Sequence, residues 1–331
     1  MEKPKAQVTE IKESLHPYLE RVERLIVDYL QSDIELLNAT NHLLRQRPGK
    51  MLRPTLGLLC AGAAGGINED SVRFAAASEL LHNATLLHDD VVDDAKQRRG
   101  APTVSSILNG QASVLIGDYW LVKCMQVVLA SSSKADRVIR IFAKTLSDLA
   151  EGEILQLQKA GDATTTEDDY LRIIYCKTAS LFEASALAAA VSAGAPERVE
   201  IALSNFARNL GLAFQIKDDI FDYSAPEAEV GKPVGIDLLE QKITQPLLCA
   251  LDMAAPQEAA SIREKVKSVQ DNPALAAEIR AFVMEKDEVA QASRKQDFYI
   301  EKAISYLGTL SDSPEKSYLA ELARYVGNRN V

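Results

Sequence analysis

The spacing of the prolines is the feature that most constrains how this chain can fold. None of the twelve prolines lies between Thr103 and Ala195. Proline removes a backbone donor and clashes with the preceding helical turn, so a long stretch without it permits long helices. Apolar residues recur at helical spacing in this stretch and on both sides of it, and no alternating β-branched series is present. The sequence therefore predicts an all-α protein.

The same periodicity predicts where the helices lie: 8–30, 34–46, 71–95, 112–130, 136–159, 168–193, 197–223, 237–252, 257–270, 275–293, 297–309 and 315–326. Turn-like segments such as QRRGAPT and YSAPEAEVGKPVG separate them. No composition shift, Gly/Ser linker or internal repeat marks a boundary. We therefore predict a single domain over residues 1–331.

Composition excludes several classes of protein. The net charge of −10 argues against a nucleic-acid surface built on overall charge. The four cysteines are widely spaced, with no CxxC pair, which indicates neither a zinc site nor a disulfide framework. The N-terminus lacks a signal-peptide core, and the uncharged run 54–68 is shorter than the roughly 20 apolar residues of a membrane span. We expect a cytoplasmic protein without a transmembrane segment.

The stretch LLHDDVVDD, residues 86–94, places several aspartates at the end of an apolar helical pattern. On a helix Asp89 and Asp93 share a face, and Asp90 is offset by about 100°. The usual explanation of such a pair is a solvated acidic face. Here the apolar context disfavours it, because unpaired buried charge is destabilising unless a cation or a basic group neutralises it.

A second acidic motif supports a shared cation site. FQIKDDIFD, residues 214–222, repeats the pattern with Asp218, Asp219 and Asp222. Neither motif has the glycine and ligand spacing of an EF-hand. Magnesium binds few carboxylates and keeps positions for water and phosphate oxygens, so the pair of motifs favours a magnesium cluster and a polyphosphate ligand.

Basic residues near predicted loops and helix ends complete this interpretation. Each alone is weak, since a surface lysine usually has no special role, but together they provide enough charge to clamp two diphosphates. They are Lys50, Arg53, Arg98, Arg99, Lys177, Lys232 and Lys242. No Walker-type GxxxxGK[ST] is present, so this is not P-loop phosphate chemistry.

These motifs, in this order and spacing, resemble those of the trans-prenyltransferases, the head-to-tail polyprenyl diphosphate synthases. The resemblance extends from about Lys50 to the C-terminal YVGNR and rests on GKMLRP, HDDVVD with RRGAPT, GQASVLIGDYW, EGEILQ, KTASLF and FQIKDDIFD. It implies the isoprenoid synthase fold, a single large helical bundle around a central cavity, and a homodimer.

The resemblance also implies a role for each matching residue. Three Mg²⁺ ions per active site would be held by Asp89, Asp90, Asp93, Asp218, Asp219 and Asp222. The allylic leaving group would be neutralised by Arg98, Lys177, Lys232 and Lys242, and isopentenyl diphosphate would be bound by Lys50, Arg53, His82 and Arg99. Thr178 and Gln215 would line the reacting centre. The catalytic set is then Asp89, Asp90, Asp93, Arg98, Lys177, Gln215 and Asp218.

His82 has a plainer alternative, because a lone histidine among apolar residues is more often a hydrogen-bonded core residue. It precedes Asp89 by seven residues, about 20° from the same helical face. A departure from the family pattern occurs at Gln241 and Gln245, where EQKITQP stands in place of EGK.TLP. We expect altered loop geometry there and retained activity.

The implied reaction needs no protein nucleophile. Magnesium and basic groups stabilise the charge of the departing diphosphate, the isopentenyl double bond attacks the allylic cation, and proton loss leaves a chain five carbons longer. The primer would be farnesyl or geranylgeranyl diphosphate. A terpene cyclase usually carries an NSE/DTE-type second motif, and a non-catalytic regulatory subunit tends to lose aspartates or arginines; both alternatives fit this sequence less well.

The residues below Asp89 bear on product length. Ala84 and Thr85 are small, where short-chain members carry bulky aromatics as a floor. Further turns, each about 5.4 Å deep, continue downward with Leu81, Ser78, Ala77 and Phe74. We predict a product of about C30 to C50 for quinone side chains, as in octaprenyl, heptaprenyl or solanesyl diphosphate synthases, with a transient membrane contact during its release. A short-chain farnesyl or geranylgeranyl diphosphate synthase is the alternative.

Overall fold

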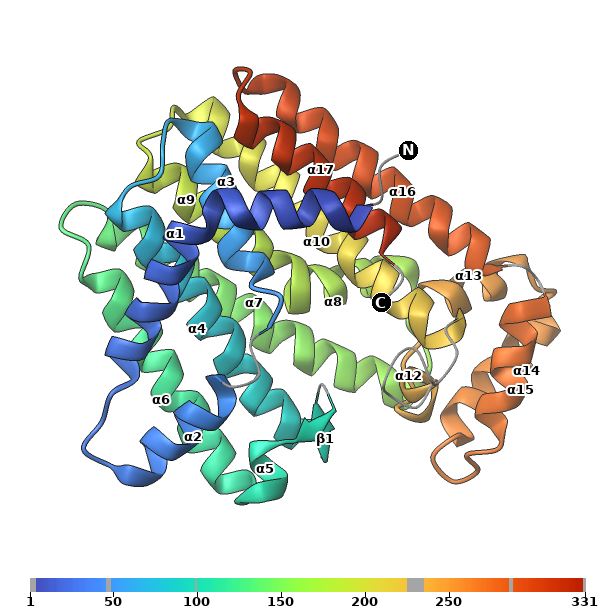
Figure 1. The fold of residues 1–331 in the computed structure, drawn as a ribbon. Helices are drawn as coiled ribbons and strands as arrows, with labels where there is room; N and C mark the ends of the chain where they lie inside the picture. The colour runs from blue at the N-terminus through green and yellow to red at the C-terminus, as the bar shows by residue number, and fades with distance from the viewer. Residues whose placement is uncertain (1–3, 46–48, 99, 225–234, 286–287, 330–331) are drawn as a thin grey trace. The chain divides into compact units, whose positions relative to one another are not determined.

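The structure is a computed structural model that describes all residues except 1–3, 46–48, 99, 225–234, 286–287 and 330–331. The described residues are almost entirely helical (Figure 1). The strands among them are the two-residue β1 (Gln97–Arg98) and β2 (Ala101–Pro102), which pair antiparallel. The prediction of an all-α protein is confirmed.

The N-terminal half contains α1 (Pro4–Leu30), α2 (Glu35–Arg45), α3 (Leu52–Ala64), α4 (Glu69–Val92), α5 (Val104–Ile107), α6 (Gly110–Leu129) and α7 (Ala135–Asp162). After it come α8 (Glu167–Ile174), the π-helical turn η1 (Tyr175–Ala179), α9 (Ser180–Ser192) and α10 (Glu197–Ser224). The C-terminal part has α12 (Ile236–Leu239), α13 (Gln245–Met253), α14 (Pro256–Ser268), α15 (Leu275–Glu285), α16 (Glu288–Tyr306), the 3₁₀ turn η2 (Leu307–Thr309) and α17 (Pro314–Asn328).

The chain groups into two compact units, each built from separate stretches of sequence. The first unit contains Met1–Lys144, Leu181–Ser204 and Leu307–Glu321; the second contains Thr145–Ser180, Asn205–Tyr306 and Leu322–Val331. Neither unit is a continuous segment, so no single point divides the sequence into two domains. A single domain over residues 1–331 stays a prediction.

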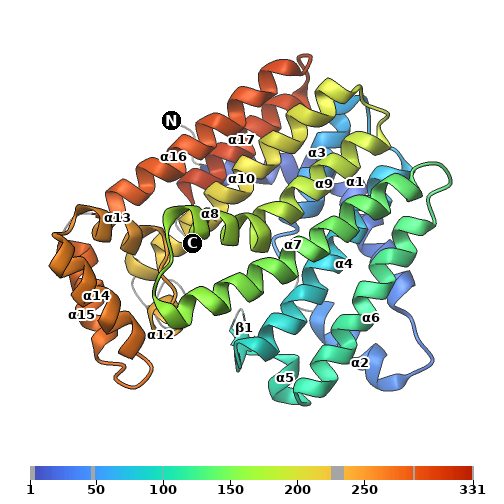
Figure 2. The same cartoon turned by 180° about the vertical axis from the view of Figure 1, so that it is seen from behind.

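Helix α4 is the central element of the first unit. It lies beside α6 and α3, as both views show (Figures 1 and 2). Asn68 caps its N-terminus by accepting a hydrogen bond from the backbone N–H of Ser71 at 3.0 Å. Neighbouring helices cover several of its faces, which explains why apolar residues surround the whole helix. The first acidic motif ends this buried helix.

The core of the second unit forms where α10 meets α8, α13, α15 and α16. Ile216 and Ile220 of α10 are buried there together with Leu247 and Val283. Helices α14 and α15 pack side by side as an antiparallel pair (Figures 1 and 2). The second acidic motif therefore also lies on a core helix.

Several predicted helices differ from those of the structure, and α15 (Leu275–Glu285) and α16 (Glu288–Tyr306) replace the predicted 275–293 and 297–309. Helix α3 was missed because its residues 54–61 are all buried, which removes the polar face that periodicity requires. The predicted helix 237–252 is two helices, α12 and α13. Gln241 adopts a left-handed backbone with φ of 59° between them, and Pro246 lies in the first turn of α13, where its missing N–H is tolerated.

Among the residues that the structure describes, two helical stretches are long and apolar enough to cross a membrane by length and composition alone, Gly110–Leu129 and Glu167–Ser192. In the second, 78% of the apolar window is buried inside the protein, which is the burial of a core helix. In the first, α6, the buried share is 39%. Neither is a clear membrane span.

Candidate active site

The first acidic motif lies at the C-terminal end of α4. Asp90 is buried, with 5% of its surface exposed, and its Oδ1 accepts a hydrogen bond from Nε of Arg98 at 2.6 Å. Asp89 is half-buried, and Asp93, the C-cap of the helix, is exposed. The motif thus combines one neutralised carboxylate with two nearer to solvent.

Arg98 reaches Asp90 because the predicted turn QRRGAPT folds as a small hairpin. Arg98 pairs with Ala101 across it, and Gly100 has a φ of 73°, which favours glycine. Thr103 closes the hairpin by donating a hydrogen bond from Oγ1 to the backbone oxygen of Ala95 at 2.7 Å. Arg99, predicted to bind isopentenyl diphosphate, lies outside the described residues.

His88 holds the motif against α6. Its Nε2 lies 3.2 Å from a carboxylate oxygen of Asp118 and 3.3 Å from the backbone oxygen of Val114. A Cβ at position 117 would lie 2.5 Å from that nitrogen, so only glycine permits the approach. The GQASVLIGDYW segment therefore supports the first acidic motif.

The other residues predicted to bind isopentenyl diphosphate also belong to the first unit. Lys50 is exposed just before α3, and Arg53 lies in the first turn of that helix with its guanidinium 4.9 Å from the Phe182 ring. His82 is half-buried on α4. Their binding roles stay predictions.

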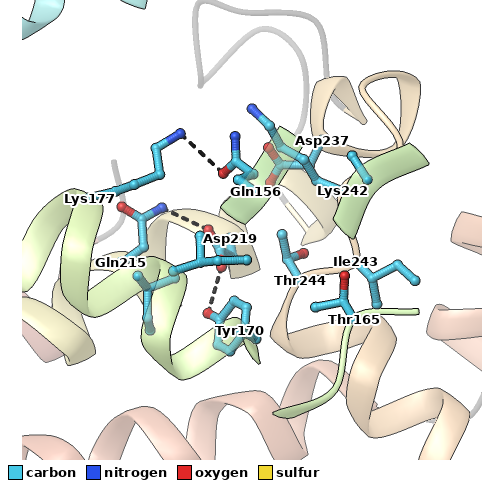
Figure 3. Close-up of a pocket in the computed structure, with 13 residues that line it drawn as sticks. Gln156, Thr165, Tyr170, Lys177, Gln215, Asp219, Asp237, Lys242, Ile243 and Thr244 are labelled. Carbon is cyan, nitrogen blue, oxygen red and sulfur yellow. Dashed lines mark hydrogen bonds between the residues drawn. The ribbon is translucent and has the colours of Figure 1, made fainter. Parts of the chain in front are cut away.

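In the second acidic motif, Asp219 is buried and bonded to uncharged donors. The hydroxyl of Tyr170 donates to its Oδ2 at 2.6 Å, and Nε2 of Gln215 donates to its Oδ1 at 2.8 Å (Figure 3). Gln215 in turn accepts at Oε1 from the hydroxyl of Thr178 at 2.7 Å. Both oxygens of Asp219 are thus used inside the protein.

Asp222 contacts backbone instead. Its Oδ1 accepts from the N–H groups of Gly235 and Ile236 at 3.1 and 3.3 Å, and its Oδ2 accepts from that of Asp237 at 3.2 Å. Asp222 therefore anchors the start of α12.

Asp218 faces the C-terminal end of the chain. Its Oδ1 accepts from Arg329 at 2.6 Å, and the same guanidinium lies 3.9 Å from the Phe214 ring. Arg329 is buried, whereas 41% of the Asp218 side chain is exposed. The arginine anchors this carboxylate from its buried side.

Lys177 lies on the π-helical turn η1 and is held by two side chains of the EGEILQ segment on α7. Its Nζ is 2.5 Å from a carboxylate oxygen of Glu153 and donates to Gln156 at 3.1 Å. A Cβ at Gly152 would lie 2.5 Å from the Cβ of Cys176, so glycine allows α7 and η1 to approach closely.

A cavity of about 90 Å³ in the second unit collects many of these groups (Figure 3). Lys242, which also pairs with Glu240, lines it beside Asp237. The other polar lining residues are Gln156, Thr165, Tyr170, Lys177, Gln215, Asp219 and Thr244. The structure therefore brings together Lys177, Gln215, Asp219 and Lys242, all predicted from sequence. Lys232, another predicted residue, lies outside the described residues.

Burial and mutual repulsion raise the pKa values of the carboxyl groups here. The pKa of Asp237 is raised to about 7, first by burial and then by the charge of Asp222. Burial also raises the pKa values of Asp219 and Asp222. A nearby cation would favour the charged form of these carboxyl groups, and carboxylate oxygens are the type of ligand that Mg²⁺ prefers. Neither unit, within its described residues, groups three Asp, Glu, His or Cys side chains closely enough to hold a metal ion.

The sequence interpretation missed Tyr170, Glu153, Gln156 and Arg329. Glu153 and Gln156 stand in EGEILQ, and Arg329 ends YVGNR, so the motifs contained them without indicating their roles. Tyr170 carried no signal, because a tyrosine on a buried helical face is normally a core residue.

Comparison with known proteins identifies the family. The Polyprenyl synthetase family profile matches residues 34–283. The octaprenyl diphosphate synthase of Haemophilus influenzae is 37% identical over 323 residues, covering 98% of this chain and 97% of that protein. Heptaprenyl diphosphate synthase component 2 of Geobacillus stearothermophilus is 34% identical over 329 residues and is covered to 99% in both chains.

A solved structure agrees with this result. The crystal structure of a polyprenyl synthase from Caulobacter crescentus, complexed with calcium and isoprenyl diphosphate, superimposes with a TM-score of 0.91 at 34% identity and 98% coverage of each chain. This chain belongs to the polyprenyl synthetase family. It is a prenyltransferase with the isoprenoid synthase fold, which confirms the predicted family, fold and reaction class.

Proposed function

We propose that this chain condenses isopentenyl diphosphate onto a farnesyl or geranylgeranyl diphosphate primer and makes a long-chain all-trans polyprenyl diphosphate. The observation that carries the proposal is the cavity of the second unit, where Lys177 and Lys242 face Gln215 and Asp219 in a member of this family. The near-complete coverage of octaprenyl and heptaprenyl diphosphate synthases supports the long product.

The two lysines are the cations for the leaving diphosphate. In the structure each is paired with a glutamate, Lys177 with Glu153 and Lys242 with Glu240. Ion pairs hold the ammonium groups in place beside the cavity, so little reorganisation is needed when a diphosphate binds. Arg98, which is paired with Asp90, is the corresponding cation at the first motif.

For magnesium we assign Asp89, Asp93 and Asp218 as the direct ligands among the six predicted aspartates, because solvent reaches them more readily than it reaches the buried Asp90 and Asp219. Asp222 accepts hydrogen bonds from backbone N–H groups with both carboxylate oxygens. Asp90, Asp219 and Asp222 would support the direct ligands from behind. Bound Mg²⁺, three ions per site by the family resemblance, would stabilise the charge that develops on the departing diphosphate.

The assigned path of the growing chain follows α4. Ala84 and Ser78 are buried, and Thr85 is half-buried. Ser78 lies 3.5 Å from Ser185 of α9, and a Cβ on Gly57 of α3 would lie 3.0 Å from the hydroxyl of Ser185. These short contacts show that α3, α4 and α9 pack closely at Ser78. The support for a product longer than that of the short-chain enzymes is therefore the absence of a bulky side chain at Ala84 and Thr85.

A homodimer is part of the proposal. Helix α6 exposes a row of large apolar residues, with Leu115 67% exposed, and α7 exposes Ile154 and Leu157. The remaining members of the row on α6 are Val114, Val122 and Leu129. Large apolar side chains exposed along one helix, as on α6, are typical of subunit interfaces. The four free cysteines are all buried, which suits a reducing cytoplasm.

The test is a product analysis of the purified chain. Supplied with Mg²⁺, isopentenyl diphosphate and each allylic primer in turn, it should release linear prenyl diphosphates of about C30 to C50, identified by mass spectrometry. Asp89→Ala should lose most of this turnover while remaining folded. Cyclic hydrocarbons or a C20 end product would overturn the long-chain proposal, and no prenyl product at all would overturn the reaction.

A further inference from the structure

We propose that Tyr170 is a positioning residue for the condensation, acting through Asp219 on the side-chain amide of Gln215. The inference rests on the proposed function of the cavity. It assigns a reaction-related role to a tyrosine that no motif singles out.

The first observation is the geometry of the Tyr170 hydroxyl. Tyr170 lies on α8 with 3% of its surface exposed, and its hydroxyl reaches Oδ2 of Asp219 at 2.6 Å. Figure 3 shows the two side chains pointing toward each other at the cavity. A short hydrogen bond between buried groups is among the stronger ones in a protein.

The second observation is that the chain of hydrogen bonds continues. The other oxygen of Asp219 accepts from Nε2 of Gln215 at 2.8 Å, and Oε1 of Gln215 accepts from the hydroxyl of Thr178 at 2.7 Å. The four side chains come from α8, α10 and η1, so three helical segments meet in one linear arrangement.

This arrangement fixes the orientation of the Gln215 amide. A glutamine amide can turn so that its oxygen and nitrogen exchange places, and its partners decide which orientation holds. If the Gln215 amide were rotated by half a turn, its oxygen would face the carboxylate oxygen of Asp219, and no hydrogen bond could form between these two acceptors. Tyr170 holds the opposite oxygen of that carboxylate, which prevents Asp219 from rotating away. Gln215 therefore presents one defined face to the cavity it lines.

The ring and the hydroxyl of Tyr170 have separable roles. The ring belongs to the apolar core that includes Ile174, Ile216 and Leu247. The hydroxyl makes the contact with Asp219. Phenylalanine keeps the ring and removes only the hydroxyl, so Tyr170→Phe tests the positioning role with little change in packing.

Tyr170→Phe should lower kcat about tenfold and leave both KM values within about twofold, because the lost hydrogen bond does not touch substrate. Tyr223→Phe is the matched control: this second tyrosine is also buried in the same core, and it forms no hydrogen bond with Asp219. Its kcat should equal that of the wild type. Equal kcat values for the two variants would overturn the proposal.

A double-mutant cycle tests whether Tyr170 acts through Gln215. In a Gln215→Ala background, Tyr170→Phe should cost less than about twofold in kcat, since the amide that it positions is gone. A full tenfold loss in both backgrounds would show that Tyr170 acts elsewhere and would overturn the proposal.

A measurement on the substrate-free protein separates this inference from the proposed function. The NMR signal of the Gln215 side-chain amide, assigned by its loss in Gln215→Ala, should shift in Tyr170→Phe and stay in place in Tyr223→Phe. Thr178→Val breaks the other end of the chain and should move the same signal, which provides a second variant if Tyr170→Phe is poorly folded. An unmoved signal in both variants overturns the inference, whereas a wild type without prenyl product overturns the proposed function alone.

Discussion

The aspartates of the two acidic motifs have the same spacing but different surroundings. Asp90 binds an arginine, Asp219 binds a tyrosine and a glutamine, and Asp222 binds backbone N–H groups. Asp94, next to the first motif, has an 85% exposed side chain and pairs with Lys96. The sequence shows only that the two motifs share one spacing. The different contacts of their carboxylates depend on partners outside each motif, such as Arg98 and Tyr170.

The raised pKa of Asp237 predicts a pH dependence of stability. A carboxyl group of an unfolded chain titrates at about pH 4, whereas that of Asp237 titrates at about 7 because burial and the charge of Asp222 disfavour ionisation. The folded protein thus binds the proton more tightly. The contribution of the protonated Asp237 carboxyl group to the free energy of unfolding is fully present below about pH 4. It is lost as the pH rises through about 7.

Urea unfolding of the metal-free protein between about pH 5 and pH 8 measures this effect. The wild type should lose more unfolding free energy over that range than Asp237→Asn, which has no proton to release. Parallel curves for the two proteins would contradict the assignment.

Gly152 offers a second prediction at this scale. Its missing side chain lets α7 approach the turn that carries Lys177, and an added Cβ would meet the Cβ of Cys176 at 2.5 Å and Cγ of Lys177 at 3.2 Å. Gly152→Ala should therefore destabilise the protein by about 1 to 3 kcal/mol and raise the KM for the primer.

Gly161 is the matched control, because it lies on the same helix and a Cβ there has nothing within 4 Å. Gly161→Ala should leave activity unchanged and raise stability slightly, since alanine favours the helix. Thermal melts and initial rates of both variants decide the matter. Similar values for the two alanine variants would refute the close approach.

Among the helices, the difference between prediction and structure at 168–193 has the largest consequence for the site. The periodicity predicted one helix, whereas the structure has α8, the π-helical turn η1 and α9. A π-turn inserts a wider turn into an otherwise regular helix and often occurs at functional sites. Here it carries Lys177 and Thr178. The spacing of apolar residues shows which side of a helix is buried, but it is hardly changed by one wider turn. The sequence therefore could not predict the π-helical turn.

Helix α12 depends on Asp222. Four residues are too few for a helix to form on its own propensity. The Asp222 carboxylate accepts hydrogen bonds from the N–H groups of the N-cap Gly235 and of the first two helical residues, Ile236 and Asp237. Asp222→Ala should lower the unfolding free energy by about 2 kcal/mol. Asp222→Asn keeps one acceptor oxygen and should lose about half as much.

Urea denaturation at one pH compares the Asp222 variants, and metal affinity provides a second measurement. The Asp222 carboxylate is engaged by three backbone N–H groups, whereas Asp218 is an assigned direct ligand of the metal. Asp222→Ala and Asp222→Asn should therefore weaken Mn²⁺ binding less than Asp218→Ala does. A larger metal defect in Asp222→Asn than in Asp218→Ala would show that Asp222 is a direct ligand instead.

For the whole molecule, the main effect of folding is to collect distant residues around one cavity. Gln156, Lys177, Gln215 and Lys242 come from four separate segments of the second unit. The residue types and order of the motifs indicated Lys177, Gln215 and Lys242 but gave no role to Gln156. The packing of α7, η1, α10 and the turn after α12 places the four side chains together.

Product length is a property of the whole bundle and gives a further prediction. Thr85 is half-buried and Ala84 is fully buried, so a larger side chain is accommodated more easily at position 85. Thr85→Phe should shorten the end product to about C20 by blocking the path beside α4. Thr85→Val, which keeps the size, should leave product length unchanged.

Mass spectrometry of the end products compares the wild type with both Thr85 variants at equal turnover. An unchanged chain length in Thr85→Phe would mean that the tail does not pass this face of α4.

What the sequence determined by itself was the chemistry. Two acidic motifs on apolar helical patterns, with basic residues near helix ends, indicated a cation and diphosphates, because buried charge requires a counter-charge. Periodicity indicated most of the helices, because each of these has one buried and one exposed face; α3, whose residues 54–61 are all buried, was missed. Only the tertiary structure decided that Tyr170 contacts Asp219, that Arg329 holds Asp218 and that a π-turn presents Lys177. Those contacts join residues far apart in the chain, and they depend on how helices pack rather than on any local pattern of residues.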